Sequence, residues 1–380
     1  MSAEWDVAVL GAGIVGASTA WHLARQGARV VVIDATGPAA EASGASDGAV
    51  SVSSKKPGVL ARLATESLLY TRTLAANGPL AGHFHPRPAW YFATSEAESA
   101  ALDALADKLA ALAGPVGIGR DGGAGLMPGT GAPVRRLVEI TGEGHMTGYS
   151  ACAAYLGDPG IARLWPARVQ GLEGLGVGVA VVLSDGRRIT AGRVVVAMGV
   201  QSPGLIAGLP VHPLAGHLIV TDRGPGALPD GALTAASYLL AKTVARGVLP
   251  DPPVVIDPLR TGQVLIGSSR VPEGDPSRID AATLLRLVQR ATQVWPALAA
   301  RRVIRVFAGV RAAVTDGLPL VGPLTGDPRV IVATGFEGDG ICLSALIGRE
   351  VAAMALGHSP SVDLEALSPA RFDPVRAVAP

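Results

Sequence analysis

Cysteine and histidine are scarce in this chain, and their scarcity excludes two kinds of protein. Only Cys152 and Cys342 occur among the 380 residues, too few for a disulfide framework and without a C-x-x-C pair, which suits a reducing cytoplasm. The seven histidines are scattered, and the close pair His83 and His85 has no Asp, Glu or Cys at ligand spacing. We therefore expect no disulfide scaffold and no metal site.

A charge excess of one sign and long apolar runs are lacking as well. The net charge is +1 with both signs scattered, which gives no footprint for nucleic acid or an anionic membrane. No stretch reaches the roughly 18 uninterrupted apolar residues of a membrane helix. Residues 1–6 carry no basic segment, so we expect no signal peptide and a cytoplasmic location.

The composition that remains is that of a well-buried globular protein. Hydrophobic residues make up 49% of the chain and charged residues 17%. A chain of 380 residues is long for one hydrophobic core, so two domains are expected.

The N-terminal 34 residues have the pattern of a βαβ unit. A short apolar run enters a Gly-x-Gly-x-x-Gly turn, an amphipathic helix follows, and a second apolar run ends at Asp34. Gly11 allows a sharp turn, Gly13 lets a pyrophosphate approach the backbone, and Gly16 lets helix and sheet pack closely. The phosphates would lie on the helix N-terminus. Asp34 would accept hydrogen bonds from a ribose and repel a 2′-phosphate, which indicates FAD or NAD rather than NADP.

Further elements follow from periodicity and from turn residues. We expect helices over about 57–75, 97–113 and 281–295, a hairpin over 177–190, and strands over 90–93, 194–199, 217–221, 264–268 and 330–334. Residues 114–131 are rich in glycine and proline and show no clear period.

Two loops are built from small residues. The loop over 36–50 would let backbone amides and Ser43 approach a flat ligand, although a flexible surface connection has the same composition. The loop over 335–341 lies between a strand and a small-residue helix, and so repeats the phosphate-cradle arrangement of the first turn.

Three segments together resemble the FAD-dependent D-amino-acid-oxidase-like family, which includes glycine oxidase, sarcosine oxidase and D-amino-acid dehydrogenases. They are the N-terminal fingerprint, residues 316–322 and the loop 335–341. Within the family, residues 44–58 and 337–341 look most like the flavin subunits of hydrogen cyanide synthase, opine oxidase and heteromeric D-hydroxyproline dehydrogenase.

The resemblance and the patterns together predict an α/β fold. A Rossmann-like FAD-binding domain, discontinuous in sequence, would comprise residues 1–77, 141–209 and 303–380. A second, α+β substrate domain on an antiparallel or mixed sheet would comprise residues 78–140 and 210–302.

The resemblance also implies which residues hold non-covalent FAD. Val169 falls where the family contacts adenine through backbone groups, and the loop 335–341 would lie against the isoalloxazine. The implied cofactor-binding residues are Gly11, Gly13, Gly16, Asp34, Ser43, Gly44, Asp47, Gly48, Ala49, Val169, Gly199, Gly335, Glu337, Gly338, Asp339, Gly340 and Ile341.

Arg311 sits where related enzymes place the arginine that binds the substrate carboxylate. A planar guanidinium can hold a carboxylate through two parallel hydrogen bonds, and the other interpretation is a salt-bridged arginine between domains. The chain departs from the family at Phe307, where Trp is common, at Ala312, where Pro is common, and at Gln201, where Trp is common. The region 145–155 is also shorter than expected.

A few other residues are candidates for chemical roles. Lys55 and its neighbour Lys56 could bind phosphate or a partner subunit, but a solvated pair is favoured. Cys342 is expected to be a packed small hydrophobe. His217 could face the pocket, although a plain hydrogen-bonded histidine is favoured.

The resemblance predicts FAD-dependent oxidation of the C–N bond of a small amino or imino acid by hydride transfer to flavin N5. The substrate would be of the D-amino acid, hydroxyproline, glycine or opine type. The branch implies a multi-subunit dehydrogenase whose partner subunits carry additional flavin or an Fe–S centre, because this chain has no Fe–S cysteine pattern. Such partners would also allow a peripheral place at the membrane.

Three other functions stay open. One is a self-sufficient oxidase that produces hydrogen peroxide, and another is a non-catalytic FAD-binding subunit. An NAD dehydrogenase is disfavoured by the second glycine loop.

Overall fold

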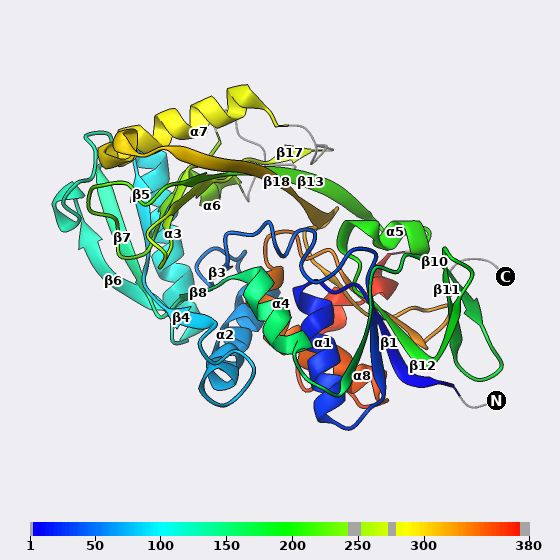
Figure 1. Ribbon diagram of the computed structural model, residues 1–380. Coiled ribbons are helices and arrows are strands. Elements are labelled where there is room, and N and C mark those ends of the chain that lie inside the picture. The colour runs from blue at the N-terminus through cyan, green and yellow to red at the C-terminus, as the bar shows by residue number, and fades with distance from the viewer. Residues whose placement is uncertain (1–2, 242–251, 273–278, 373–380) are drawn as a thin grey trace.

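The computed structural model describes residues 3–241, 252–272 and 279–372. Within these residues the strands form an eight-stranded, a nine-stranded and a three-stranded sheet. The eight-stranded sheet lies on one side of the molecule and most of the nine-stranded sheet on the other, with β13 (Val211–Thr221) and β18 (Val303–Val314) reaching across between them (Figure 1). The predicted α/β fold with two sheet systems is confirmed.

The predicted βαβ unit forms the centre of the eight-stranded sheet. β1 (Trp5–Leu10) and β2 (Val30–Ile33) pair in parallel, and α1 (Ile14–Arg25) connects them. β2 pairs in parallel with β9 (Ile161–Leu164), and β1 pairs in parallel with β12 (Arg188–Val196). Nearly every residue of β1 and β2 is buried, as parallel strands covered on both faces require.

β12 belongs to two parts of this sheet at once. Its first half pairs antiparallel with β11, and its second half pairs in parallel with β20. The sequence patterns separated residues 188–190 from 194–199, but pairing with β1 runs on from Ala191 to Val196, which makes one strand. The remaining strands of the sheet are β10 (Val169–Gly174), β11 (Val179–Leu183), β19 (Leu320–Pro323) and β20 (Val330–Thr334).

Among the described residues five helices accompany this sheet: α1, α2 (Val59–Asn77), α4 (Gly148–Leu156), the short α5 (Ser202–Leu205) and α8 (Gly340–Ala355). α1 packs against both α4 and α8, and α2 packs against α8 (Figure 1). A Cβ at Gly348 would lie 2.2 Å from the Ser18 Oγ, so α1 and α8 approach as closely as a glycine allows. The predicted helix over 57–75 is confirmed as α2.

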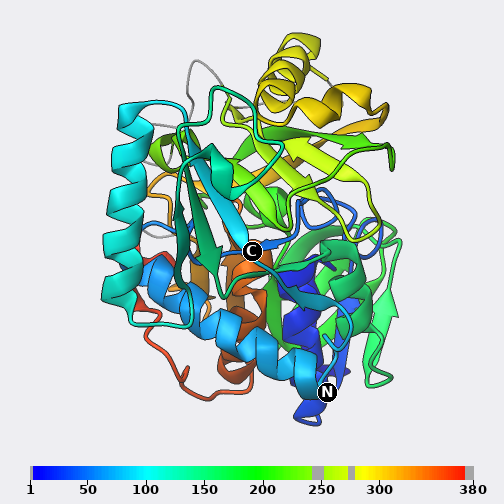
Figure 2. The same ribbon diagram turned by 90° about the vertical axis from the view of Figure 1, so that its left-hand side faces the viewer.

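The nine-stranded sheet is mixed, because β14 and β5 run in parallel while its other pairs are antiparallel. α3 (Glu96–Leu112) runs beside it, and α7 (Ala281–Val294) packs against it; in Figure 2 α3 stands at the left edge and α7 lies at the top. Ser95 and Asp280 cap these two helices by accepting backbone N–H groups. Besides β13 and β18, the strands are β5 (Ala89–Ala93), β6 (Gly117–Gly122), β7 (Arg136–Thr141), β14 (Ala232–Ala235), β15 (Val255–Pro258), β16 (Val264–Gly267) and β17 (Val271–Pro272).

β13 and β18 are the long pair of this sheet. They pair antiparallel from Val211 with Val314 to Thr221 with Val303. Among the described residues β18 pairs with no other strand, so its second edge is open near Val303 and Ile304. The domain prediction placed residues 303–380 with the FAD-binding part, whereas β18 lies in the nine-stranded sheet because its partner is β13.

Two features had no clear signal in the sequence. The stretch 114–131 contains β6 and a 3₁₀ turn over Ala124–Leu126, ordered by pairing with β7. The three-stranded sheet joins the short strands β3 (Ala49–Val50), β8 (Gly144–Met146) and β4 (Phe84–Pro86).

The ends and two internal parts of the predicted domain ranges lie outside the described residues, namely 1–2, 242–251, 273–278 and 373–380. No helix in the described ranges has both the length and the apolar character needed to cross a bilayer.

Candidate functional site

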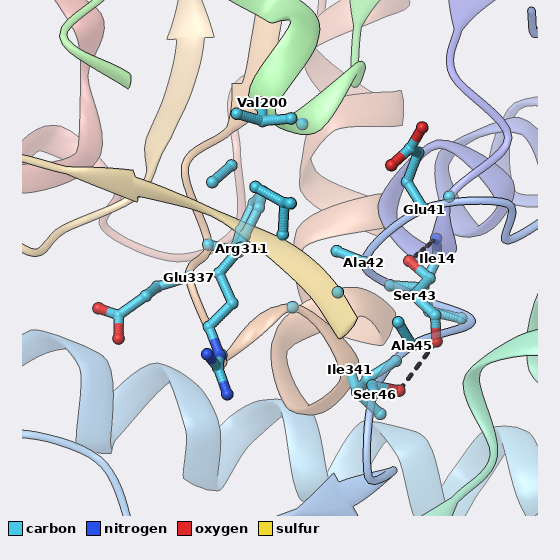
Figure 3. A pocket seen from close by; sticks show the side chains of 18 of the residues that line it. Ile14, Glu41, Ala42, Ser43, Ala45, Ser46, Val200, Arg311, Glu337 and Ile341 are labelled. Atoms are coloured by element: carbon cyan, nitrogen blue, oxygen red, sulfur yellow. Dashed lines mark hydrogen bonds between the residues drawn. The ribbon is translucent and has the colours of Figure 1, made fainter. Parts of the chain in front are cut away.

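A cavity of about 200 Å³ lies where the two sheets meet. The turns that follow four strands of the eight-stranded sheet reach it, namely those after β1, β2, β12 and β20, and β18 crosses it from the other sheet (Figure 3). Ligands of open α/β sheets bind at the carboxyl ends of the parallel strands. The predicted residues that line the cavity are Gly11, Gly13, Asp34, Ser43, Asp47, Gly199, Arg311, Gly335, Glu337, Gly338, Gly340 and Ile341.

The first glycine turn has no room for side chains. Gly11 has a φ of +105°, and a Cβ there would lie 2.4 Å from the Ala197 carbonyl oxygen. A Cβ at Gly16 would lie 2.0 Å from the Gly11 carbonyl oxygen, so Gly16 lets α1 pack on the turn. Gly13 lines the cavity and precedes α1. The close contacts agree with the tasks expected for Gly11 and Gly16, and the role of Gly13 toward a pyrophosphate stays a prediction.

Asp34 joins the ends of β1 and β2. Its Oδ2 accepts the Ala12 N–H at 2.8 Å, and its Oδ1 accepts the N–H groups of Thr36 and Gly37, each at 2.8 Å. Ser43 contacts the same turn, because its Oγ accepts the Ile14 N–H at 3.0 Å, as the dashed line in Figure 3 shows. The loop over 36–50 is therefore bound to the N-terminus of α1.

The turn at Asp47, Gly48 and Ala49 also has a defined geometry. The Asp47 carboxylate accepts the Ala49 N–H at 3.1 Å, and Gly48 has a φ of +82°. His145 contacts this turn, and its Nε2 lies 2.9 Å from the Asp47 carbonyl oxygen. Burial lowers the pKa of His145 to about 4, so the imidazole is neutral at pH 7 and donates that hydrogen bond from Nε2.

The second glycine loop is tied to β18. The Glu337 N–H donates to the Ala312 carbonyl oxygen at 2.8 Å, and the Asp339 N–H donates to the Phe336 carbonyl oxygen at 2.8 Å. Gly335 has a φ of +79°, and a Cβ there would lie 2.3 Å from the Val314 Cγ2. This arrangement brings the loop and Arg311 to the same cavity.

Lys55 corrects an expectation from the sequence. Its side chain is 2% exposed, and the ammonium lies 2.9 Å from the Asp339 carboxylate. Burial favours the neutral amine, but the charge and the hydrogen bond of Asp339, together with smaller contributions from Cys342 and Tyr238, hold the pKa of Lys55 above its ordinary value. Lys55 is thus a buried ion-pair partner of the second glycine loop rather than part of a solvated pair, while Lys56 is exposed.

Arg311 projects from β18 into the cavity (Figure 3). Its Nη2 donates to the Ser268 Oγ at 2.7 Å, and its Nη1 donates to the Ser269 carbonyl oxygen at 3.2 Å. The nearby Glu337 forms an ion pair with Arg270. The guanidinium of Arg311 is therefore held by neutral groups and keeps its positive charge for a ligand.

A second cavity of about 280 Å³ adjoins the first. Gly11 and Asp34 line both cavities, and Val169 and Gln201 line the second. An elongated ligand could therefore lie with one end near Val169, its middle at the first glycine turn and its other end near Arg311. The residues present fit a dinucleotide, because glycines stand where the backbone must approach it.

Some predicted residues do not line either cavity: Gly16, Gly44, Gly48, Ala49 and Asp339. Their positions support neighbouring turns; a Cβ at Gly44, for example, would lie 2.1 Å from the Ala39 carbonyl oxygen. Cys342 is buried, as expected.

Sequence reasoning missed several residues of the cavity. Tyr238 lies in the short helix α6 (Ser237–Ala241), and Ser268 directly follows β16. Glu41 lines both cavities and places an acidic group beside the first glycine turn (Figure 3). No sequence motif marks these positions, because distant segments of the chain come together at the cavity only in the folded protein.

Comparison with known proteins shows the family. Residues 6–354 match the DAO family, described as FAD dependent oxidoreductase. The chain belongs to this family, which confirms the resemblance seen in the sequence and makes it an FAD-dependent oxidoreductase.

Relatives extend over nearly the whole chain. The bifunctional tRNA 5-methylaminomethyl-2-thiouridine biosynthesis protein MnmC of Maricaulis maris is 29% identical over 97% of this chain, which spans only 55% of that protein. An opine oxidase subunit of Rhizobium meliloti is 25% identical, with 98% of this chain and 99% of that protein covered. The crystal structure of glycine oxidase from Geobacillus kaustophilus superposes with a TM-score of 0.84 at 23% identity, covering 99% of each chain. This last likeness shows the fold.

Proposed function

We propose that this chain oxidises the C–N bond of a small amino or imino acid. The observation that carries the proposal is that Arg311 and the second glycine loop line one cavity. A Cβ on Gly338 would lie only 3.9 Å from the Arg311 Nε, so the cationic group is directly beside the loop. The name of the opine oxidase relative agrees with a substrate of the amino-acid type.

The residues that would hold FAD follow the two cavities. Val169 would lie at the adenine, Asp34 at the ribose, and the first glycine turn with Ser43 at the pyrophosphate. The loop 335–341 would lie along the flavin edge, where backbone N–H groups and the N-terminus of α8 favour negative charge. Bound FAD supplies the hydride acceptor, N5. No cysteine or histidine lies near Arg311 in sequence, which supports non-covalent binding.

Arg311 would bind the substrate carboxylate. Its Nη1 and Nη2 each donate one hydrogen bond to the protein, which fixes the guanidinium plane before a ligand arrives. A carboxylate held by such a plane is restricted in orientation, and its α-carbon is placed accordingly. The Tyr238 side chain at the same cavity would limit the size of the substrate.

The electron acceptor is proposed to be a partner subunit. The relative from Rhizobium meliloti is named as one subunit of opine oxidase, and it matches this chain along its whole length. A partner with its own flavin or Fe–S centre would take the electrons, since this chain has no Fe–S cysteine pattern.

An anaerobic substrate screen tests the chemistry. The FAD-loaded protein is mixed with glycine, D-amino acids, proline derivatives and opines, and bleaching of the flavin absorbance is followed. We expect bleaching by at least one of these acids, and its loss in Arg311→Met with FAD binding retained. If none bleaches the flavin, the chain is a non-catalytic FAD-binding subunit and the proposal is wrong.

A second measurement decides the acceptor. With a bleaching acid in hand, dye reduction is compared with peroxide formation in air. Dye reduction without matching peroxide supports the dehydrogenase subunit. Peroxide formed at the rate of dye reduction would instead identify a self-sufficient oxidase.

A further inference from the structure

The two serines that bind Arg311 are buried, and one of them is bonded to a further residue. Arg311 donates to Ser268 and Ser269, which follow β16 and are 5% and 1% exposed. A Cβ at Gly216 would lie 2.3 Å from the Arg311 Nη1 and 2.8 Å from the Ser269 carbonyl oxygen. The guanidinium therefore passes β13 at Gly216, where the absence of a side chain leaves room for it.

His217 follows Gly216 on β13. Because successive strand residues face opposite sides of a sheet, its side chain lies on the face opposite to Arg311. The His217 N–H donates to the Ser269 Oγ at 2.8 Å, and the His217 Nδ1 lies 2.7 Å from the same oxygen. Ser269 thus bonds to His217 through its hydroxyl and to Arg311 through its carbonyl.

The ring of His217 also contacts the start of α7. The Asp280 N–H donates to the His217 Nε2 at 3.4 Å. When Nε2 accepts this hydrogen bond, the tautomer with the proton on Nδ1 lets Nδ1 donate to the Ser269 Oγ. Asp280 also caps α7 by accepting the Ala282 and Thr283 N–H groups. A continuous path of hydrogen bonds leads from the start of α7 through His217 and Ser269 to Arg311.

We propose that His217 is a positioning residue for Arg311, acting through Ser269 to hold the guanidinium where a substrate carboxylate binds. The proposal rests on the proposed function of Arg311. His217 is 3% exposed, so replacing its side chain would remove the Nδ1 contact of the buried Ser269 hydroxyl, while the backbone N–H of residue 217 stays in place. A displacement of about 1 Å at a binding group can reduce a rate about 100-fold, so we expect carboxylate affinity to respond strongly.

The test separates ligand positioning from FAD binding and from catalysis. Acetate is titrated into FAD-loaded protein, and its dissociation constant is read from the change in flavin absorbance. We expect His217→Ala and Ser269→Gly to raise this constant about 10-fold or more. His217→Asn should recover much of the loss, because its amide can donate in place of Nδ1. The control is His212→Ala, which changes an exposed histidine of the same strand.

Further readouts identify a merely structural role. The FAD dissociation constant of His217→Ala should remain near that of His212→Ala, and with a substrate KM should rise more than kcat falls. Acetate binding equal to that of His212→Ala overturns the proposal, as does a parallel loss of FAD binding. If Arg311→Met also leaves acetate binding unchanged, the carboxylate role of Arg311 fails and the inference fails with it.

Discussion

Replacement of Lys55 by methionine should destabilise the protein strongly. The ammonium of Lys55 lies 2.9 Å from the Asp339 carboxylate, and the two side chains are 2% and 14% exposed. Methionine retains much of the volume of lysine but removes the positive charge that lies beside the Asp339 carboxylate. Removing one partner of a buried pair costs about 3 to 5 kcal/mol, which is the decrease we expect in the free energy of unfolding.

The assay is urea unfolding at saturating FAD, followed by circular dichroism. Lys56→Met is a matched control, since Lys56 is adjacent and exposed and its replacement should change stability by less than about 0.5 kcal/mol. Asp339→Asn should also destabilise, and the double variant Lys55→Met with Asp339→Asn should lose clearly less than the sum of the single losses.

Two results would refute this reasoning. One is a loss in Lys55→Met no larger than that in Lys56→Met. The other is strict additivity in the double variant, which would mean that the two charges do not stabilise each other.

Three further changes have defined expected results. Gly11→Ala should abolish FAD binding and lower the free energy of unfolding by about 3 kcal/mol or more, because the new Cβ overlaps with Ala197. The control Gly27→Ala, where φ is +81° and the space around the residue is open, should cost about 1 kcal/mol in thermal unfolding. Equal losses in the two variants would contradict the overlap. Burial lowers the pKa of His22 to about 4 from its ordinary 6.5, so protonation favours the unfolded chain. About 3 kcal/mol of the free energy of unfolding should therefore be lost as the pH falls from 6.5 to 4. Urea titrations at several pH values should show that His22→Gln lacks this pH dependence. Glu41→Gln should tighten FAD binding about 3- to 10-fold at low salt, because the carboxylate beside the first glycine turn would repel the diphosphate of FAD. An unchanged affinity in a fluorescence titration would mean that the diphosphate binds elsewhere.

The first glycine turn was predictable because its physics is local. Gly11, Gly13 and Gly16 stand at fixed spacing at the start of a helix, and the observed contacts give Gly11 and Gly16 the expected reasons. Arg311 could be proposed from the family resemblance, and the structure places it at the cavity with the second glycine loop.

The remaining parts of the site depend on contacts between distant segments. Lys55 meets Asp339 across most of the chain, and nothing near either residue in sequence distinguishes it from an exposed one. Ser268 and Tyr238 reach the cavity because they follow β16 and β14, two strands of a sheet that joins distant segments of the chain. Periodicity likewise could not show that residues 188–196 form one strand, because β1 supplies the continuous pairing.

The open edge of β18 has a consequence for the solution behaviour of the protein. Val303 and Ile304 on this edge are 52% and 54% exposed, and an apolar strand edge invites pairing with a strand of another molecule. Arg302 and Arg305 are exposed on either side of them. Two copies that paired along this edge would bring Arg302 and Arg305 of each copy close together. The resulting charge repulsion should oppose aggregation through β18, the strand that carries Arg311. High salt, which screens that repulsion, should weaken the protection.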